Sequence, residues 1–282
     1  MTRRESLVAD GALALTTVIW GTTFPLNKQI LEILPPFGFM CLRFVLATVA
    51  LALVARGSLA RLDRRAWGAA LLLSALLFLG FAFQLYGLRM TTPTKNAFLT
   101  SVSVPMVPFI GLWILRHRPG IASWIGCGLA FAGSLILTYQ PGILIGPGDL
   151  LTLVCALCFA VQIVMMSKLM PGRSATAMTT AVCLCTALFS GAAWFVFREP
   201  RIDPAVVPWG AMLWLGVIAN GIPLLVQSWA QKHTTAVHVA VIYALEPLFA
   251  ALFSYLWLGD QMTPQAWVGG GVILAGVVVS EL

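Results

Sequence analysis

The residues of this chain that could do chemistry are a few polar side chains set within long apolar segments. Glu246 is the one acidic residue placed well inside such a segment, and Arg43 is the one arginine placed far from a segment end. An ionised carboxylate inside a bilayer costs roughly 2.5–3.5 kcal/mol, so Glu246 must be protonated, paired or turned to water. Three roles are open to it: a gating or structural ion pair with Arg43, a proton-coupling group, or a direct contact with a bound small molecule.

A second set of polar residues follows helical spacing. Asn96, Thr100 and Ser103 are spaced i, i+4, i+7 and therefore share one face of a helix. A repeat in the second half of the chain maps the last two onto Tyr243 and Glu246. We expect both faces to line a cavity that hydrogen-bonds a small molecule. The alternative is hydrogen bonding between helices, which contributes below ~1 kcal/mol per bond in a membrane.

Other polar residues recur at equivalent places in the two halves of the chain. Gln84 is matched by Gln227, and Thr23 is matched by Gln162. Repeated polarity of this kind predicts that the axis relating the two halves passes near these residues. They are expected either to bind a small molecule or to form hydrogen bonds between packed helices. Aromatic residues could wall the same cavity or anchor helices at the membrane interface. They are Trp20, Phe83, Tyr86, Trp229 and Tyr243.

Two prolines are matched in the same way. Pro105 and Pro247 stand at equivalent places in the two halves, each near the middle of an apolar segment. A proline inside a helix removes a backbone hydrogen bond and kinks the helix. The two kinks are predicted to be either hinges that open one side of the molecule or static bends.

The elements that position these residues are ten apolar segments. Each is close to the roughly 20 residues that a membrane-spanning helix needs. Sixty per cent of the chain is hydrophobic and 10% is charged, and the mean hydropathy is +0.93. So little chain remains for a soluble catalytic domain that we do not expect an enzyme. The predicted spans are residues 8–27, 35–55, 66–88, 94–115, 121–139, 149–169, 175–197, 205–230, 235–258 and 263–281.

The net charge of +7 reports topology, and a nucleic-acid partner is not expected. With the N-terminus in the cytoplasm, eleven of the 17 basic residues fall in cytoplasmic segments, five on the opposite side, and Arg43 within a span. The segment at 56–65 contributes most to this asymmetry. The positive-inside rule therefore predicts that both termini are cytoplasmic.

The cysteines do not point to a metal or redox centre. All six lie within predicted spans, and the pair Cys155 and Cys158 has no histidine or acidic residue close to it in the sequence. Buried free thiols behave as small hydrophobic groups. We expect no metal and no cofactor.

The second half of the chain repeats the first. Gly126, Gly128 and Gly133 of the fifth span recur at the same spacing in the tenth, beginning at Gly269. Because five spans per repeat is an odd number, the second repeat enters the membrane from the opposite side. The prediction is an all-α membrane protein of ten transmembrane helices in two inverted five-helix repeats. Its units are a first repeat at residues 1–140, a connector at 141–148 and a second repeat at 149–282.

Three stretches carry a resemblance to a known family. They are residues 20–24 (WGTTF), residues 148–151 (GDLL), and residues 247–253 (PLFAALF) followed by 258–260 (LGD). Together with the proline in each fourth span and the glycines in each fifth, they resemble the drug/metabolite transporter superfamily and its EamA-type ten-span exporters. The chain departs from that pattern at residues 115–118, where the family often has a glutamate, and at Asp260, which replaces one.

The resemblance implies a secondary transporter of the bacterial inner membrane. It would export small metabolites, amino acids (aromatic ones included) above all, by alternating access around a midplane site where the repeats meet. The alternative is a proton-coupled multidrug efflux protein for apolar cations, with Glu246 and either Trp20 or Tyr243 at its site. The expected partners are a small-molecule substrate and the lipid bilayer, with the chain a monomer or a homodimer.

Overall fold

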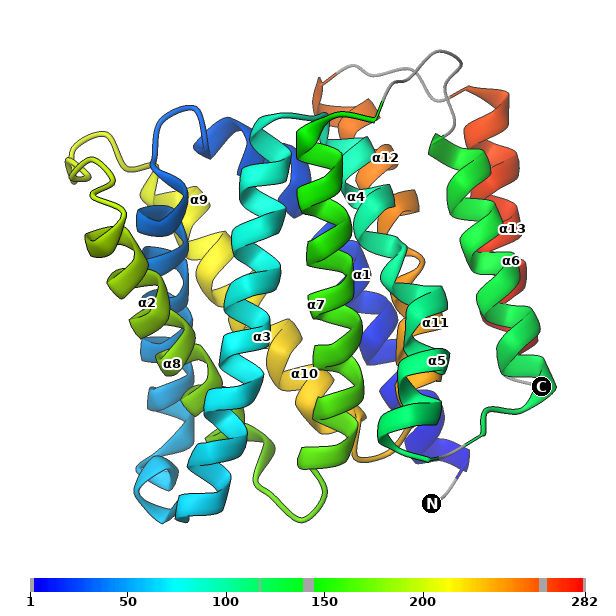
Figure 1. Ribbon diagram of the computed structural model, residues 1–282, viewed down its shortest axis with the longest axis horizontal. Helices are drawn as coiled ribbons and strands as arrows, with labels where there is room; N and C mark the ends of the chain where they lie inside the picture. Colours follow the sequence, from blue (N-terminus) through cyan, green and yellow to red (C-terminus); the bar gives the residue numbers. More distant parts are fainter. Residues whose placement is uncertain (1–2, 117, 139–144, 259–262, 281–282) are drawn as a thin grey trace.

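The structure is a computed structural model that describes residues 3–116, 118–138, 145–258 and 263–280. Within those ranges the chain is a bundle of helices without strands, and ten helical passes run side by side (Figure 1). The passes are α1 (Arg3–Ile30), α2 (Pro36–Ala55), α3 (Arg64–Arg89), α4 (Pro93–Ser101) with α5 (Ser103–Ile114), α6 (Ile121–Thr138), α7 (Pro147–Leu169), α8 (Ala175–Val196), α9 (Trp209–Leu213) with η2 (Trp214–Gly221) and α10 (Ile222–Ala230), α11 (Ala236–Tyr243) with α12 (Glu246–Leu258), and α13 (Pro264–Ser280).

Each pass corresponds to one predicted span. Eight of them are long and apolar enough to cross a membrane, and α13 is a shorter apolar helix. The remaining pass, α1, carries four buried threonines. The helix can carry these hydroxyls in a membrane because each donates to a backbone carbonyl three residues earlier. Half of the predicted connector (141–144), His117 and Asp260 lie outside the described residues.

The fourth and ninth passes are each broken into two helices at a place fixed by proline. Pro105 has no N–H to bond the carbonyl four residues earlier, and α4 ends at that residue, Ser101. Pro247 stands in the same relation to Tyr243, where α11 ends. The predicted kinks are therefore present as breaks between helices, at equivalent points of the two repeats.

The eighth pass, predicted as a membrane span at 205–230, is not α-helical throughout. It begins at Trp209, and its middle, Trp214–Gly221, is π-helical. Pro223, two residues after this segment, leaves the carbonyl of Ala219 without its usual α-helical partner. The indole Nε1–H of Trp20 donates to that carbonyl at 2.8 Å. Irregular backbone of this kind is common at functional sites.

The two repeats are interlocked. Equivalent helices of the two repeats pack on each other, α2 on α8 and α6 on α13. α7 of the second repeat packs on α3, α4 and α5 of the first. In the equivalent way, α1 of the first repeat packs on α10, α11 and α12 of the second. The seam between α6 and α13 is made of glycines: a methyl group on Gly133 would come within 2.7 Å of the Gly269 carbonyl oxygen, and one on Gly126 within 2.7 Å of the Gly276 carbonyl oxygen. Such close approach is typical of helix pairs in membranes.

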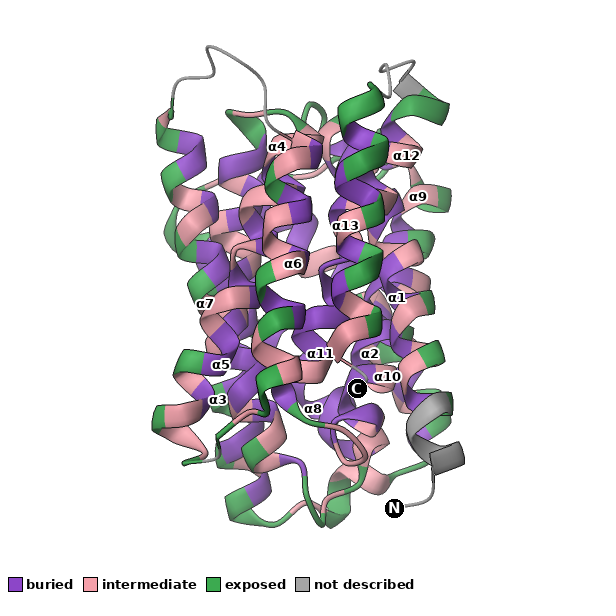
Figure 2. Cartoon of the chain, turned by 90° about the vertical axis from the view of Figure 1, so that its right-hand side faces the viewer, coloured by how far each residue is buried: buried purple, intermediate pink, exposed green. Residues whose placement is uncertain are grey.

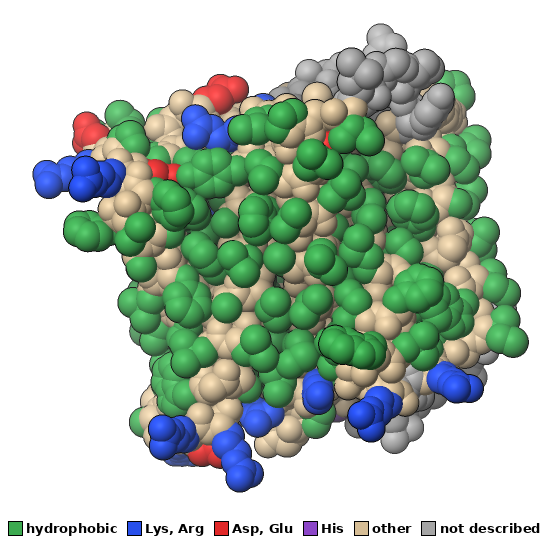
Figure 3. All heavy atoms as spheres, viewed as in Figure 1, with side chains coloured by type: hydrophobic (Ala, Val, Ile, Leu, Met, Phe, Trp, Pro, Cys, Tyr) green, Lys and Arg blue, Asp and Glu red, His purple; other side chains and the backbone are tan. Residues whose placement is uncertain are grey.

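The outer surface matches a lipid environment. Figure 2 shows exposed residues along the outward faces of α6 and α13, with buried residues turned inward. Hydrophobic side chains cover the middle of the visible face in Figure 3, and Lys and Arg gather along the edge where the N-terminus lies. Large apolar side chains are exposed on the surface of the bundle, among them Trp113, Phe195 and Trp267. An apolar surface of this extent marks a membrane-embedded protein.

Candidate functional site

A cavity lies between the two repeats, at the centre of the bundle. Its empty volume, including the part open to solvent, is about 720 Å³, and α1, α2, α3, α4, α5, α7, η2, α10, α11 and α12 all contribute to its wall. Nine of the eleven residues predicted to bind a small molecule line it. They are Trp20, Thr23, Gln84, Thr100, Ser103, Gln162, Gln227, Tyr243 and Glu246.

The other two predicted residues lie elsewhere. Phe83 is half-buried on α3 and is not part of the cavity wall. Asn96 is fully buried, and its side chain donates to the Thr152 hydroxyl at 2.8 Å, away from the cavity lining. The prolines predicted to act as hinges, Pro105 and Pro247, are also absent from the wall, although the breaks that they cause place Ser103 and Glu246 in it.

Arg43 lines the cavity from α2 and is only 1% exposed. Its Nη2 donates to Oδ1 of Asn220, and its guanidinium lies 4.8 Å from the ring centre of Phe81 and 5.4 Å from that of Phe39. Its Nε and Nη1 have no hydrogen-bond partner among the described residues. The site thus presents unused donors on a buried cation.

The ion pair considered between Arg43 and Glu246 is not formed. In the described part of the chain the ion pairs are Lys95–Asp149 and His238–Asp10. Glu246 is the first residue of α12, is half-buried, and lines the cavity. No hydrogen bond joins its carboxylate to another described residue. The positions of the two residues along their helices predict their depth in the membrane but do not determine which neighbour Arg43 faces. The segment η2 places Asn220, rather than Glu246, beside Arg43.

The matched glutamines have different partners. Gln84 donates to the Thr100 hydroxyl at 3.2 Å, whereas Gln227 donates to the Gln162 side-chain oxygen at 3.3 Å. The two equivalent positions therefore each place a glutamine amide in the cavity wall, but the two amides have different hydrogen-bond partners.

Aromatic side chains form the apolar part of the cavity wall. Trp20 meets Tyr243 edge-to-face, with ring centres 4.8 Å apart. Phe81 and Phe159 meet in the same geometry at 5.3 Å, and all four line the cavity. The other predicted wall residues are elsewhere, since Tyr86 donates to Glu199 and Trp229 packs against His233.

Some cavity residues were not predicted from the sequence. Asn220 is one, although a polar residue next to Gly221 and shortly before Pro223 is a signal of a non-helical, functional segment. Phe81 and Phe159 are the others with a clear role in the wall. Phenylalanine is common in apolar spans, so the sequence alone does not distinguish these two residues from phenylalanines that face lipid or pack in the core.

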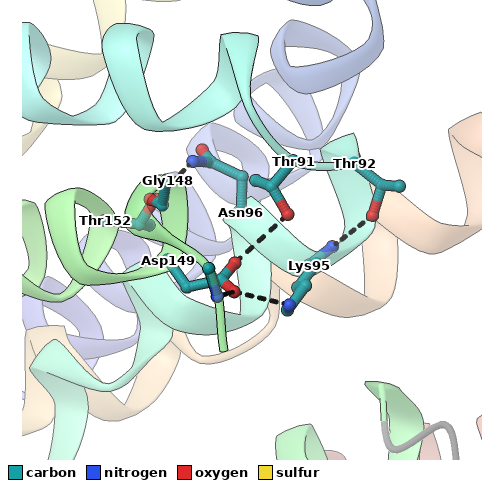
Figure 4. Close-up of polar contacts among 8 residues, drawn as sticks. Thr91, Thr92, Lys95, Asn96, Gly148, Asp149 and Thr152 are labelled. Carbon is teal, nitrogen blue, oxygen red and sulfur yellow. Dashed lines mark hydrogen bonds and ion pairs between the residues drawn. The ribbon is translucent and has the colours of Figure 1, made fainter. Parts of the chain in front are cut away.

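Two ion pairs occupy equivalent positions at opposite ends of the bundle. At the start of α7, Asp149 accepts from Lys95 of α4 at 2.6 Å and from the Thr91 hydroxyl at 3.2 Å, beside the Asn96–Thr152 bond (Figure 4). At the start of α1, Asp10 lies 2.9 Å from Nε2 of His238 in α11. The repeat in the sequence relates Asp10 to Asp149 and Lys95 to His238. Both pairs join the two repeats.

The fold and the repeated helices agree with what the chain resembles in sequence. The model of the EamA-like transporter family matches residues 7–139 and again 146–282, so the chain belongs to this family of membrane transporters. An uncharacterized transporter of Archaeoglobus fulgidus is 32% identical over 99% of this chain and 87% of its own length. The uncharacterized transporter YetK of Bacillus subtilis is 23% identical over 99% of this chain and 88% of its own.

A solved structure supports the fold independently. It superposes with a TM-score of 0.80 at 19% sequence identity and covers 99% of this chain and 97% of its own, under the description "Crystal structure of protein". The expectation of a drug/metabolite transporter with two helical repeats is thereby confirmed. Together with the apolar helices, the relatives identify a multi-pass membrane transporter.

Proposed function

We propose that this transporter exports amino acids across the bacterial inner membrane by alternating access around the central cavity. One observation carries the proposal: the cavity between the repeats contains a guanidinium, Arg43, and a carboxylate, Glu246, that are not paired with each other. A zwitterion offers a complementary charge to each. The aromatic wall, with Trp20 against Tyr243, suits side chains of varied shape.

The alternative of an apolar cation as substrate is supported less well. Glu246 and Trp20 would suit such a compound. Arg43, however, is a buried positive charge in the same wall without a carboxylate partner in the described residues. Like charges repel strongly in a medium of low dielectric constant. A cation entering the cavity would meet that repulsion.

The proposed orientation follows the distribution of basic residues. Lys and Arg gather at the edge where the N-terminus lies, so we assign that edge to the cytoplasm. The Asp10–His238 pair then faces the cytoplasmic side and the Lys95–Asp149 pair the outer side. Glu246 is either a substrate contact or a group that couples export to protons, and the chain acts as a monomer or a homodimer.

The test is counterflow of labelled amino acids in proteoliposomes that contain the purified protein, with and without a pH gradient. We expect exchange of neutral and aromatic amino acids without a gradient, and loss of any pH dependence in Glu246→Gln if that carboxylate couples protons. Absence of amino-acid movement together with gradient-driven transport of an organic cation would replace this proposal with the efflux alternative.

A further inference from the structure

The unsatisfied groups of the cavity are mostly hydrogen-bond donors. Arg43 keeps Nε and Nη1 free, and Asn220 keeps its Nδ2 free. The orientation of the Asn220 amide is fixed, because a guanidinium only donates and its Nη2 must meet the amide oxygen. The amide nitrogen is then left as a donor beside the cation. The wall at this point offers several N–H groups and no acceptor for them among the described residues.

Burying this cluster of unpaired donors costs free energy unless a ligand supplies a hydrogen-bond acceptor. A buried charge taken out of water needs a partner of opposite charge, or several hydrogen bonds, to offset its desolvation. Arg43 is 1% exposed, lines the cavity, and has one hydrogen bond, to a neutral amide, with the rings of Phe39 and Phe81 close by. The described residues place no carboxylate within ion-pair distance of it. The site is electrostatically incomplete without a ligand.

The backbone holds both residues in place. Gly216 of η2 packs directly on α2, and a methyl group there would come within 2.8 Å of the carbonyl oxygen of Arg43 itself. Asn220 lies one turn further along the same π-helical segment, 1% exposed. The two side chains therefore belong to one rigid contact between α2 and η2.

We propose that Arg43 and Asn220 form a subsite for the carboxylate of the substrate, and that this carboxylate is the obligatory feature of whatever the protein carries. The proposal rests on, and deepens, the proposed transport function. A guanidinium binds a carboxylate by donating two parallel N–H···O bonds, so the carboxylate is held in a fixed orientation as well as neutralised in charge. The free Asn220 N–H₂ group adds a donor at the edge of the same subsite.

The subsite also sets the direction in which the substrate lies. α8, the helix equivalent to α2, contains no basic residue at all. The position equivalent to Glu246 is Ser103. The two charged groups thus have no charged counterparts, and the carboxylate can bind at only one place in the cavity. An ammonium group, where present, then points toward Glu246.

The experiment measures binding by the rise in melting temperature of the purified protein and transport by counterflow. The probes are L-phenylalanine, its methyl ester, phenethylamine and 3-phenylpropionate. We expect the two carboxylates to bind about tenfold to a hundredfold more tightly than the ester and the amine, the range expected for a charge-assisted hydrogen-bonded contact. Equal binding of acid and ester would overturn the subsite.

Asn220→Asp is the decisive variant, because it supplies Arg43 with a carboxylate from the protein itself. We expect a melting temperature equal to or above that of the native protein, together with at least a tenfold loss of affinity for both carboxylates. Unchanged affinity would contradict the proposal. Arg43→Lys keeps the charge but not the planar fork and should bind with intermediate affinity. The matched control, Arg89→Gln at the exposed end of α3, should bind like the native protein.

The two proposals fail in different ways. If 3-phenylpropionate binds and Asn220→Asp abolishes that binding while no amino acid is transported, the carboxylate subsite stands and the amino-acid function falls. If amino acids are transported and phenethylamine is transported equally well, the transport function stands and the subsite falls.

Discussion

α7 and α1 are equivalent helices of the two repeats, yet the contacts near their N-terminal ends differ. At α7 the contact is polar: Asp149 pairs with Lys95, and Thr152 accepts from Asn96. At α1 the ion pair of Asp10 remains, but Leu13 and Val239 occupy the other two positions, and both are completely buried. One end is joined by directional bonds and the other largely by apolar packing. Single substitutions should therefore act more strongly at the α7 end.

The largest effect is expected at Gly87, where α3 crosses the start of α7. A methyl group there would come within 2.4 Å of the Thr152 hydroxyl and 2.7 Å of the Gly148 carbonyl oxygen. Gly87→Ala should lower stability by about 3 kcal/mol through overpacking, measured by thermal unfolding in detergent. The equivalent residue at the α1 end is Ala230, and Ala230→Gly should cost only about 1 kcal/mol. Equal effects would show that the two ends are packed alike.

The next effect concerns the charged pairs. Asp149→Ala removes the carboxylate that Lys95 contacts at 2.6 Å and the acceptor for the Gly146 N–H, so we expect a loss of about 2 kcal/mol in the free energy of unfolding. Asp10→Ala should cost less, because the apolar packing beside it stays intact. The exchanged pair Lys95→Asp with Asp149→Lys should recover part of the loss. A larger loss for Asp10→Ala would reverse the comparison.

A smaller loss of stability is expected when the polar residues at the α7 end are replaced by apolar ones like those of the α1 end. Asn96→Val alone should cost about 1 kcal/mol, because it removes the bond to Thr152. Adding Thr152→Val makes the pair apolar, as Leu13 and Val239 are, without enlarging the side chain that packs on Gly87, and should restore most of the stability. Thermal unfolding of the single and double variants measures the coupling. Additive losses would mean that the two residues do not act as a pair.

The smallest effect should be equal at both ends. Thr92 caps α4 by accepting from the Lys95 N–H at 3.3 Å, and Thr235 caps α11 by accepting from the His238 N–H at 3.2 Å. Each threonine replaced by alanine should cost roughly 0.5–1 kcal/mol. Unfolding curves of the two variants should nearly coincide. A clear difference would indicate that one cap does more than end a helix.

Much of the architecture could be predicted from the sequence because membrane helices leave strong signals. Long apolar runs, the constant offset between the repeats and the matched prolines predict the ten passes and the breaks at Ser101 and Tyr243. A proline acts on a carbonyl four residues earlier whatever surrounds it. That local rule explains why the broken passes could be predicted without knowledge of the packing.

The site was predicted less completely, since it depends on the rotation of helices about their axes. The sequence placed Arg43 and Glu246 in the membrane interior, but the pairing of Arg43 with Asn220 depends on the π-helical turn at 214–221, which shifts the register of the helix by a residue. Asn96 shares a helical face with Thr100, yet Thr152 of α7 approaches it and accepts its side-chain hydrogen bond.

The glycine seam between α6 and α13 has a consequence for how the protein is made. Among the described helices α13 is synthesised last, and it packs chiefly on α6, which is synthesised before the second repeat begins. At usual rates of synthesis the intervening chain takes on the order of ten seconds to appear. During that interval the glycine face of α6 has only lipid against it. A nascent chain that stops short of residue 264 would therefore leave this face permanently uncovered and give quality-control proteases a recognisable defect.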